Sequence, residues 1–140
     1  INPSEIRDTM QRTMQRYAPV YRDQDTMIKG IEIMKGLFKD FENIKLSDSS
    51  MIWNTDLAET LELNNLLYQS LATLYSASER KETRGAHARD DFPERDDKNW
   101  LKHSLVSVTN DGEPVYNYKD VVLETLTDEM ETVELKARTY

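Results

Sequence analysis

The sequence predicts a mainly α-helical fold: an antiparallel three-helix bundle similar to a spectrin repeat, followed by a charged loop and a small C-terminal β-hairpin. Three observations predict it. Apolar residues recur at three- and four-residue spacing in three stretches of the chain. Short connections between these stretches favour antiparallel neighbours. Two β-prone segments flank an Asp-Gly turn nearer the end of the chain.

The first helix is expected near residues 4–17. Asn2 is a good capping residue, and Pro3 fits the first turn because the N–H that proline lacks would have no helical partner there. Glu5 is favourable at the positive end of the helix dipole. The helix carries a stripe of apolar side chains, namely Ile6, Met10, Met14 and Tyr17. Pro19 then ends the helix.

The second helix is expected near residues 22–44. Its apolar stripe consists of Met27, Ile31, Met34, Phe38 and Phe41. Methionine side chains on such a face either fill a core or line a peptide-binding groove, and the core is the simpler interpretation. Gly30 and Gly36 weaken the helix, but they would allow another helix to approach closely.

The third helix is expected near residues 55–80, beginning after Asn54 and ending at Arg80. Its apolar face is built from leucines, namely Leu57, Leu61, Leu67, Leu71 and Leu74. Further apolar residues widen this face almost all round the helix. A helix that is apolar on most sides is expected at the centre of a bundle.

After Arg80 the helical pattern gives way to a charged segment, residues 80–103, and then to β-prone residues around a turn at Asp111 and Gly112. We therefore expect two parts of one domain. Residues 1–103 contain the helical bundle with the charged segment, and residues 104–140 contain the β-hairpin and the C-terminal tail.

Composition excludes several classes of function. A net charge of -8 disfavours nucleic-acid binding, which needs a positive field. The absence of cysteine excludes disulfides, thiolate nucleophiles and thiolate metal sites. The four glycines form neither a dinucleotide-binding fingerprint nor a P-loop. No apolar run approaches the roughly 18 residues that span a bilayer, so direct membrane insertion is not expected. Because the chain starts at Ile1 rather than Met, we expect a processed product or a piece of a longer protein.

Two histidines could carry chemistry as metal ligands or as a general acid and base. His87 and His103 are far apart in the sequence, and a metal site would need nearby carboxylates, namely Asp90, Asp91, Asp96 or Asp97. Carboxylates that are adjacent in sequence seldom face one another, which makes them poor acid–base pairs. Hydrogen-bonded or solvated histidines explain the pattern more simply, so we assign no catalytic, cofactor-binding or metal-binding residue.

The charged segment is either a solvated loop or a docking interface. Its acidic and basic residues are interleaved, and Gly85, Phe92, Pro93 and Trp100 are unusual in disordered charge runs. Guanidinium groups pair bidentately with carboxylates, as desolvated polar interfaces require. We therefore predict a docking interface at Arg84, Gly85, His87, Arg89, Asp90, Asp96, Asp97, Trp100, Lys102 and His103.

The same segment resembles a known family. The stretches of residues 82–87 (E-T-R-G-A-H), 89–91 (R-D-D) and 100–105 (W-L-K-H-S-L) are similar to the C-terminal region of succinate dehydrogenase and fumarate reductase flavoprotein subunits. The ending, residues 137–140 (A-R-T-Y), also looks like that family's carboxyl terminus. Trp100 favours the succinate dehydrogenase branch. Glu134 and Leu135 depart from the family, which often has prolines there. The resemblance covers essentially the whole chain.

The resemblance implies a parent enzyme several times longer that oxidises succinate to fumarate in the tricarboxylic acid cycle and electron transport. FAD and the substrate-binding residues would lie in other domains, so no cofactor is expected in this chain and the isolated chain should be inactive. The implied partners are the flavin-binding domain of the same subunit and the iron–sulfur subunit. The implied location is peripheral, at the cytoplasmic face of a bacterial inner membrane or on the mitochondrial matrix side.

Alternatives remain open from the residues alone. The chain could be the corresponding domain of a fumarate reductase or an L-aspartate oxidase, or a free-standing helical interaction module.

Under the docking hypothesis Arg84 and Arg89 pair with the flavin-binding domain in the full subunit. In the isolated chain they should then be solvated, and replacing either with alanine should cost no more than about 0.5 kcal/mol.

Overall fold

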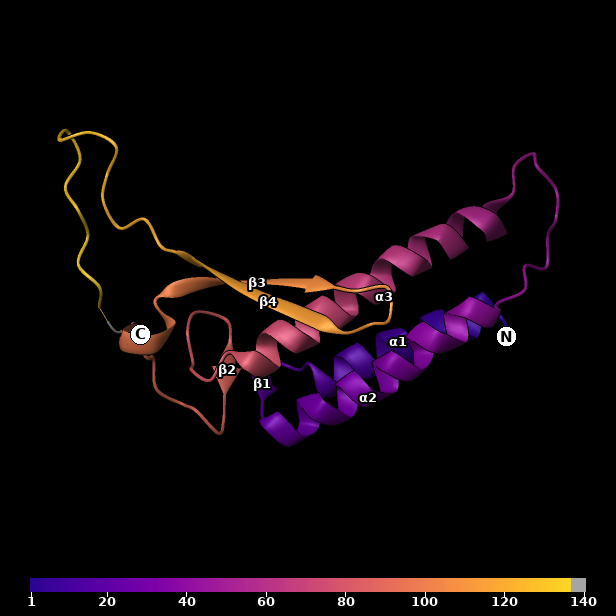
Figure 1. Ribbon diagram of the computed structural model, residues 1–140, viewed down its shortest axis with the longest axis horizontal. Helices are drawn as coiled ribbons and strands as arrows, with labels where there is room; N and C mark the ends of the chain where they lie inside the picture. Colours follow the sequence, from indigo (N-terminus) through magenta and orange to yellow (C-terminus); the bar gives the residue numbers. More distant parts are fainter. Residues whose placement is uncertain (137–140) are drawn as a thin grey trace.

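The structure, a computed structural model, describes residues 1–136, so the A-R-T-Y ending at 137–140 lies outside the described residues. Three long helices form most of it: α1 (Pro3–Tyr17), α2 (Gln24–Asp40) and α3 (Thr55–Glu79). They run in alternating directions, and the hairpin lies along α3 (Figure 1). The sequence placed α1 and α3 within a residue of these bounds. It extended α2 too far, because the chain tightens into a 3-10 turn, η1 (Phe41–Asn43), after Asp40.

Each long helix begins at a side chain that caps its first turn. The Asn2 carboxamide oxygen accepts a hydrogen bond from the Ser4 N–H at 3.0 Å. Asp23 caps α2 in the same way, 2.9 Å from the Thr26 nitrogen. Such caps satisfy N–H groups that have no partner within the helix, which is why the helices begin where they do. Asn54 does the same for α3.

The core lies between the three long helices. Its buried apolar side chains come from all three, with α3 supplying the most, and they include Ile6, Met10, Met34, Phe38, Leu63, Leu67, Leu71, Leu74 and Tyr75. Met27 and Met34 are fully buried, which favours core filling over a peptide groove. A Cβ at Gly30 would lie 2.6 Å from the Tyr17 Cβ, so this glycine does permit close approach of α1. Gly36 has no neighbour near enough for that role.

The C-terminal hairpin is confirmed. Strand β3 (Lys102–Val108) pairs antiparallel with β4 (Pro114–Asp120), and Val108 lies opposite Pro114. Gly112 in the turn has a φ of 78°, a conformation that favours glycine. The Tyr75 hydroxyl of α3 donates a hydrogen bond to the Gly112 carbonyl at 2.7 Å. This buried bond ties the turn of the hairpin to the core.

A short pair of parallel strands and a single helical turn were also not predicted from the sequence. Strand β1 (Tyr21–Arg22) pairs parallel with β2 (Ala88–Arg89), and a single helical turn, α4 (Asp97–Trp100), precedes β3. Both involve the charged segment, whose alternating charges conceal any periodicity. Within the described part of the chain, no helix combines the length and the apolar character needed to cross a membrane.

Candidate docking site

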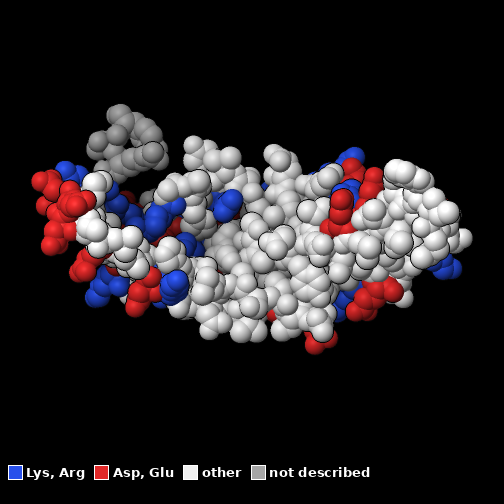
Figure 2. All heavy atoms as spheres, turned by 90° about the horizontal axis from the view of Figure 1, so that it is seen from above, with Lys and Arg blue, Asp and Glu red and all other residues white. Residues whose placement is uncertain are grey.

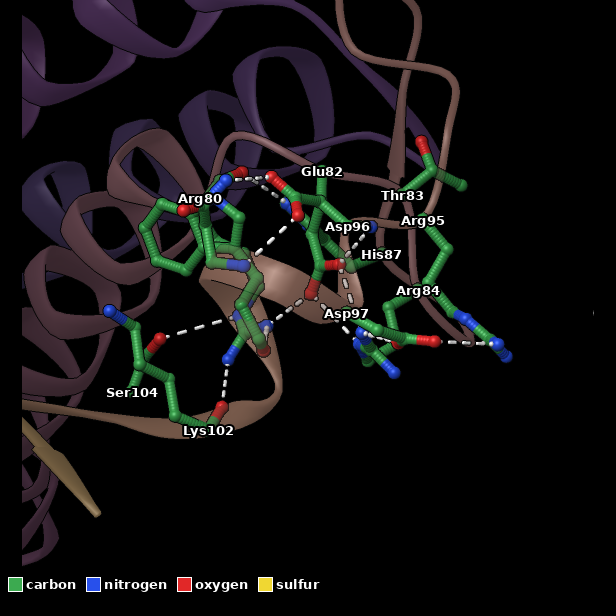
Figure 3. A network of polar contacts seen from close by, with 12 residues as sticks. Arg80, Glu82, Thr83, Arg84, His87, Arg95, Asp96, Asp97, Lys102 and Ser104 are labelled. Atoms are coloured by element: carbon green, nitrogen blue, oxygen red, sulfur yellow. Dashed lines mark hydrogen bonds and ion pairs between the residues drawn. The ribbon is translucent and has the colours of Figure 1, made fainter. Parts of the chain in front are cut away.

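The charged segment folds back against the C-terminal end of α3 (Figure 3). Gly85, with a φ of 58°, lies in a tight turn in which Arg84 and His87 exchange backbone hydrogen bonds of 2.9 and 3.0 Å. The Thr83 hydroxyl accepts a hydrogen bond from the Arg89 N–H at 2.9 Å. Together with the β1–β2 pair, these bonds return the chain to the helix end.

Arg89 is buried at the end of α3, with a side chain that is 0% exposed. Its Nη1 group donates to three carbonyls at the end of the helix, those of Ala77 (3.1 Å), Ser78 (3.1 Å) and Arg80 (3.2 Å). The last carbonyls of a helix have no partner within it, so this guanidinium supplies what the helix lacks. Its positive charge also lies at the negative end of the helix dipole.

The remaining N–H groups of the Arg89 guanidinium also have hydrogen-bond partners. Asp91 accepts from Nε at 2.7 Å and from Nη2 at 2.8 Å, and Gln24 accepts from Nη2 at 2.9 Å. The hydrogen bonds from Arg89 lower the pKa of Asp91 to about 2, against the opposing effect of burial. The Arg89 side chain therefore joins α2, α3 and the charged segment.

A second buried charge, Glu82, organises the other side of the segment, and its side chain is 0% exposed. It accepts hydrogen bonds from Arg80, from Arg84 Nε at 2.9 Å and from the Asp96 N–H at 2.9 Å. Burial alone would raise the pKa of Glu82, but these hydrogen bonds together hold it below its usual value. The carboxylate is thus fully paired within this chain.

Arg80 connects this cluster to the hairpin. Its guanidinium lies 5.2 Å from the centre of the Trp100 ring and donates to the Trp100 carbonyl at 2.9 Å. It also donates to the Lys102 carbonyl and, at 3.3 Å, to the Ser104 hydroxyl. These contacts fix the position where β3 begins.

His87 is held by hydrogen bonds at both ring nitrogens. Nε2 lies 3.1 Å from the Arg80 carbonyl, which can only accept, so Nε2 carries the proton. Nδ1 then accepts from Arg22 Nη1 at 3.2 Å. Burial lowers the pKa of His87, with nearby arginines acting in the same direction, so the ring is neutral at neutral pH. His103 instead lies exposed on β3, and among residues 1–136 no three His, Asp or Glu side chains gather as a metal site.

An open cavity of about 380 Å³ lies beside His87. Arg22, Arg80, Ser76 and Ser104 are among the side chains that line it. The guanidinium and hydroxyl groups supply donors, and Ala72 and Ala77 supply an apolar part of the same lining. The cavity can receive a carboxylate or a carbonyl oxygen from a neighbouring protein surface.

The structure brings most of the predicted docking residues together but corrects the state of two of them. The expectation that Arg84 and Arg89 are solvated in this chain is wrong: Arg89 is buried, and Arg84 is 27% exposed and bonded to Glu82 and to Asp97, the latter at 2.5 Å. Gly85, Asp90 and His103 remain exposed. The physical reason for the error is that the interleaved carboxylates are partners within the chain.

Sequence reasoning missed the residues that hold the cluster together, Arg80, Glu82, Asp91 and Gln24. One signal was available for three of them. Arg80 and Glu82, like Arg89 and Asp91, are opposite charges two residues apart where a helix ends and an irregular segment turns back. Gln24 gave no such signal, because its contact with Arg89 spans 65 positions of the sequence.

Comparison with known proteins identifies one family. The family described as "Fumarate reductase flavoprotein C-term" matches residues 7–140. The succinate dehydrogenase flavoprotein subunit of Rickettsia bellii (strain RML369-C) is 47% identical over 140 residues, which is 100% of this chain and 24% of that protein. The subunit of the same name from Rickettsia conorii (strain ATCC VR-613 / Malish 7) is 49% identical over 137 residues, 98% of this chain and 23% of that protein.

A solved structure of the quinol fumarate reductase of E. coli has the same fold. It matches with a TM-score of 0.85 at 38% identity, and the match covers 91% of this chain and 22% of that one. The chain therefore spans less than a quarter of the length of these proteins. Because sequence and fold agree over nearly all of it, this chain belongs to the family of C-terminal regions of succinate dehydrogenase and fumarate reductase flavoprotein subunits.

Proposed function

We propose that this chain is the C-terminal helical domain of a succinate dehydrogenase flavoprotein subunit. The full subunit would oxidise succinate to fumarate and pass the electrons through FAD to an iron–sulfur subunit and a quinone. The observation that carries this proposal is 47% identity over the whole chain to a protein named as that subunit. The matched E. coli structure is a quinol fumarate reductase, which makes fumarate reduction the alternative direction of the same chemistry.

FAD, where bound, would accept the two electrons that succinate loses. The residues of this chain do not fit FAD, because its glycines form no dinucleotide-binding fingerprint. We therefore place the flavin in the part of the subunit outside this domain. We assign no step of the reaction to a side chain of this domain.

The role that we propose for the domain is to brace the flavin-binding domain. In this proposal α1, α2 and α3 form an antiparallel bundle of the spectrin-repeat kind, and residues 1–103 and 104–140 are two parts of one domain. The bond between Tyr75 and Gly112 supports the second point, because it ties the hairpin to α3. The complex would be peripheral to its membrane, with the iron–sulfur subunit as a further partner.

The charged segment would contribute docking surface through the groups that its own salt bridges leave available. The cavity beside His87 offers donors to a carboxylate or carbonyl of the flavin-binding domain. Exposed residues at the turn and on β3, namely Gly85, Asp90 and His103, would border this contact. Arg84 and Arg89, which are paired with carboxylates of this chain, would hold the exposed residues of this surface in position.

Flavin content and substrate oxidation test this proposal. The full-length subunit should retain one flavin after gel filtration and reduce an electron-accepting dye with succinate. The isolated chain, incubated with FAD and freed of excess flavin, should retain none. One retained flavin per isolated chain would overturn the assignment of FAD. Oxidation of L-aspartate instead of succinate would indicate an aspartate oxidase, and a full-length protein without flavin would indicate an interaction module.

A further inference from the structure

The loop between η1 and α3 exposes three consecutive large apolar side chains. Met51 is 89% exposed, Ile52 is 76% exposed and Trp53 is 93% exposed. Loop tips usually carry small polar residues, and contiguous exposed apolar groups mark sites of protein contact. Tryptophan and methionine are also enriched where interfaces are buried. None of these three side chains belongs to the hydrophobic core.

The base of this loop is fixed by hydrogen bonds. The Asn54 side chain donates to the carbonyls of Asp48 at 3.0 Å and Ser50 at 2.8 Å. The Asp56 carboxylate accepts from the backbone N–H groups of Ser47 at 2.8 Å and Asp48 at 3.2 Å. A loop that is already ordered loses less conformational entropy when it binds. The hydrogen-bonded base of the loop therefore holds the three apolar residues in place before a partner binds.

Trp53 also has an unusual backbone conformation. Its φ is 54°, and in the described residues 1–136 it is the only non-glycine residue with a positive φ. A left-handed conformation is energetically costly for an L-residue that carries a side chain. Such a cost is typical of sites where the backbone presents a side chain for a function. Burial of the Trp53 indole does not offset this cost within this chain, because the ring is exposed.

Charge limits what can cover the loop. The sequence around the apolar tip is acidic on balance: Asp48, Asp56, Glu59 and Glu62 outnumber the basic residues there, which are Lys45 and, paired with Glu62 at 3.8 Å, Arg7. This net negative charge disfavours an anionic membrane surface, and a second copy would bring the same net negative charge. Figure 2 shows that uncharged atoms dominate the middle of one face and the end that carries this loop, whereas charged groups gather at the opposite end. The complementary surface is an apolar recess with basic groups around it.

We propose that Met51, Ile52 and Trp53 dock into an apolar recess with a basic rim that another part of the same flavoprotein subunit forms. This inference rests on the proposed function. This chain covers 24% of the Rickettsia bellii subunit, so the remaining length of such a protein supplies a large protein surface on the same polypeptide. A tethered partner of that kind is present at high effective concentration. The domain would then contact the subunit at the loop as well as at the charged segment.

Hydroxyl-radical oxidation of the full-length flavoprotein subunit, purified without its partner subunits, tests the proposal. Oxidation of Met51 and Trp53 is measured by peptide mass mapping in the native protein and in urea. Because oxidation follows solvent exposure, docking should slow both residues roughly fivefold or more relative to urea. Met27 and Met34, which are 0% exposed, define the fully protected limit. Native rates within about twofold of the rates in urea would overturn the proposal.

A matched pair of variants tests the recess directly. Trp53→Ser should release the tip and raise the native oxidation rate of Met51 several-fold. Val122→Ser removes an apolar side chain that is 79% exposed elsewhere, and it should leave Met51 protected. Protection of Met51 that survives Trp53→Ser, or that appears only after the iron–sulfur subunit is added or the protein dimerises, would contradict docking within the subunit.

The docking proposal and the proposed function can fail independently of each other. Flavin retention with succinate oxidation, but without protection of Met51, would remove the docking proposal alone. Protection of Met51 in a full-length protein that lacks flavin would remove the proposed function and leave the docking contact in place.

Discussion

Replacing Arg89 with alanine is expected to lower the free energy of unfolding of the 140-residue chain by about 3–5 kcal/mol, as loss of one partner of a buried ion pair does. The substitution would leave the Asp91 carboxylate without its guanidinium and three carbonyls at the end of α3 without a donor. Arg89→Lys should still cost on the order of 2 kcal/mol, because a lysine keeps the charge but cannot reproduce the planar fork of donors.

Urea unfolding at neutral pH measures this effect. Arg12→Ala is the matched control, because Arg12 pairs with Asp8 but its side chain is 80% exposed, and it should change stability by no more than about 0.5 kcal/mol. If Arg89→Ala proved as mild as Arg12→Ala, Arg89 would be solvated in this chain after all.

Replacing Glu82 with alanine should destabilise the chain by about 3–5 kcal/mol, since it leaves the Arg80 and Arg84 guanidinium groups without their shared carboxylate. Glu82→Gln keeps the shape but loses the charge, so its cost should be smaller. Glu32→Ala, at an exposed position on α2, is the control and should cost no more than about 0.5 kcal/mol.

The Glu82 pKa also predicts the direction of a pH effect. An unfolded glutamate titrates near pH 4.3, and the pKa of Glu82 is lower in the folded chain, so acid protonates the unfolded state first. The stabilisation by Glu82 is therefore complete above about pH 4.3 and is lost as the pH falls toward the folded value. Between pH 7 and pH 3.5 the wild type should lose more stability than Glu82→Gln. Equal losses in the two proteins would mean that the charge of Glu82 does not stabilise the fold.

The elements that sequence predicted well are those with local causes. Asn2 and Asn54 cap their helices through bonds to residues two or three positions away, and Gly112 sets its turn by its own backbone. The end of α2 was misplaced because Ile44 continues the apolar spacing although the backbone has already left the α-helix. Apolar spacing reports which side chains face the core, and it does not report whether the backbone remains helical.

The docking role of the charged segment stays a prediction, and the arrangement of its side chains was not predictable from the sequence. Interleaved arginines and carboxylates have the same composition whether they pair with each other or with another domain. The contacts of Arg89 with Gln24 and of Arg22 with His87 each span 65 positions, so only the folded chain reveals them. The role of the segment within this chain therefore follows from burial and geometry.

We propose that this domain supports a flavin-bearing subunit without supplying any of its chemistry. The most direct test compares the full-length subunit with a truncated form that lacks these 140 residues. Flavin per chain after gel filtration is the measured quantity, with succinate-dependent dye reduction as a second readout. The truncated form should lose most of its flavin, and its dye reduction per retained flavin should stay near that of the full-length subunit. A truncated form that holds one flavin per chain as firmly as the full-length subunit would contradict the claim.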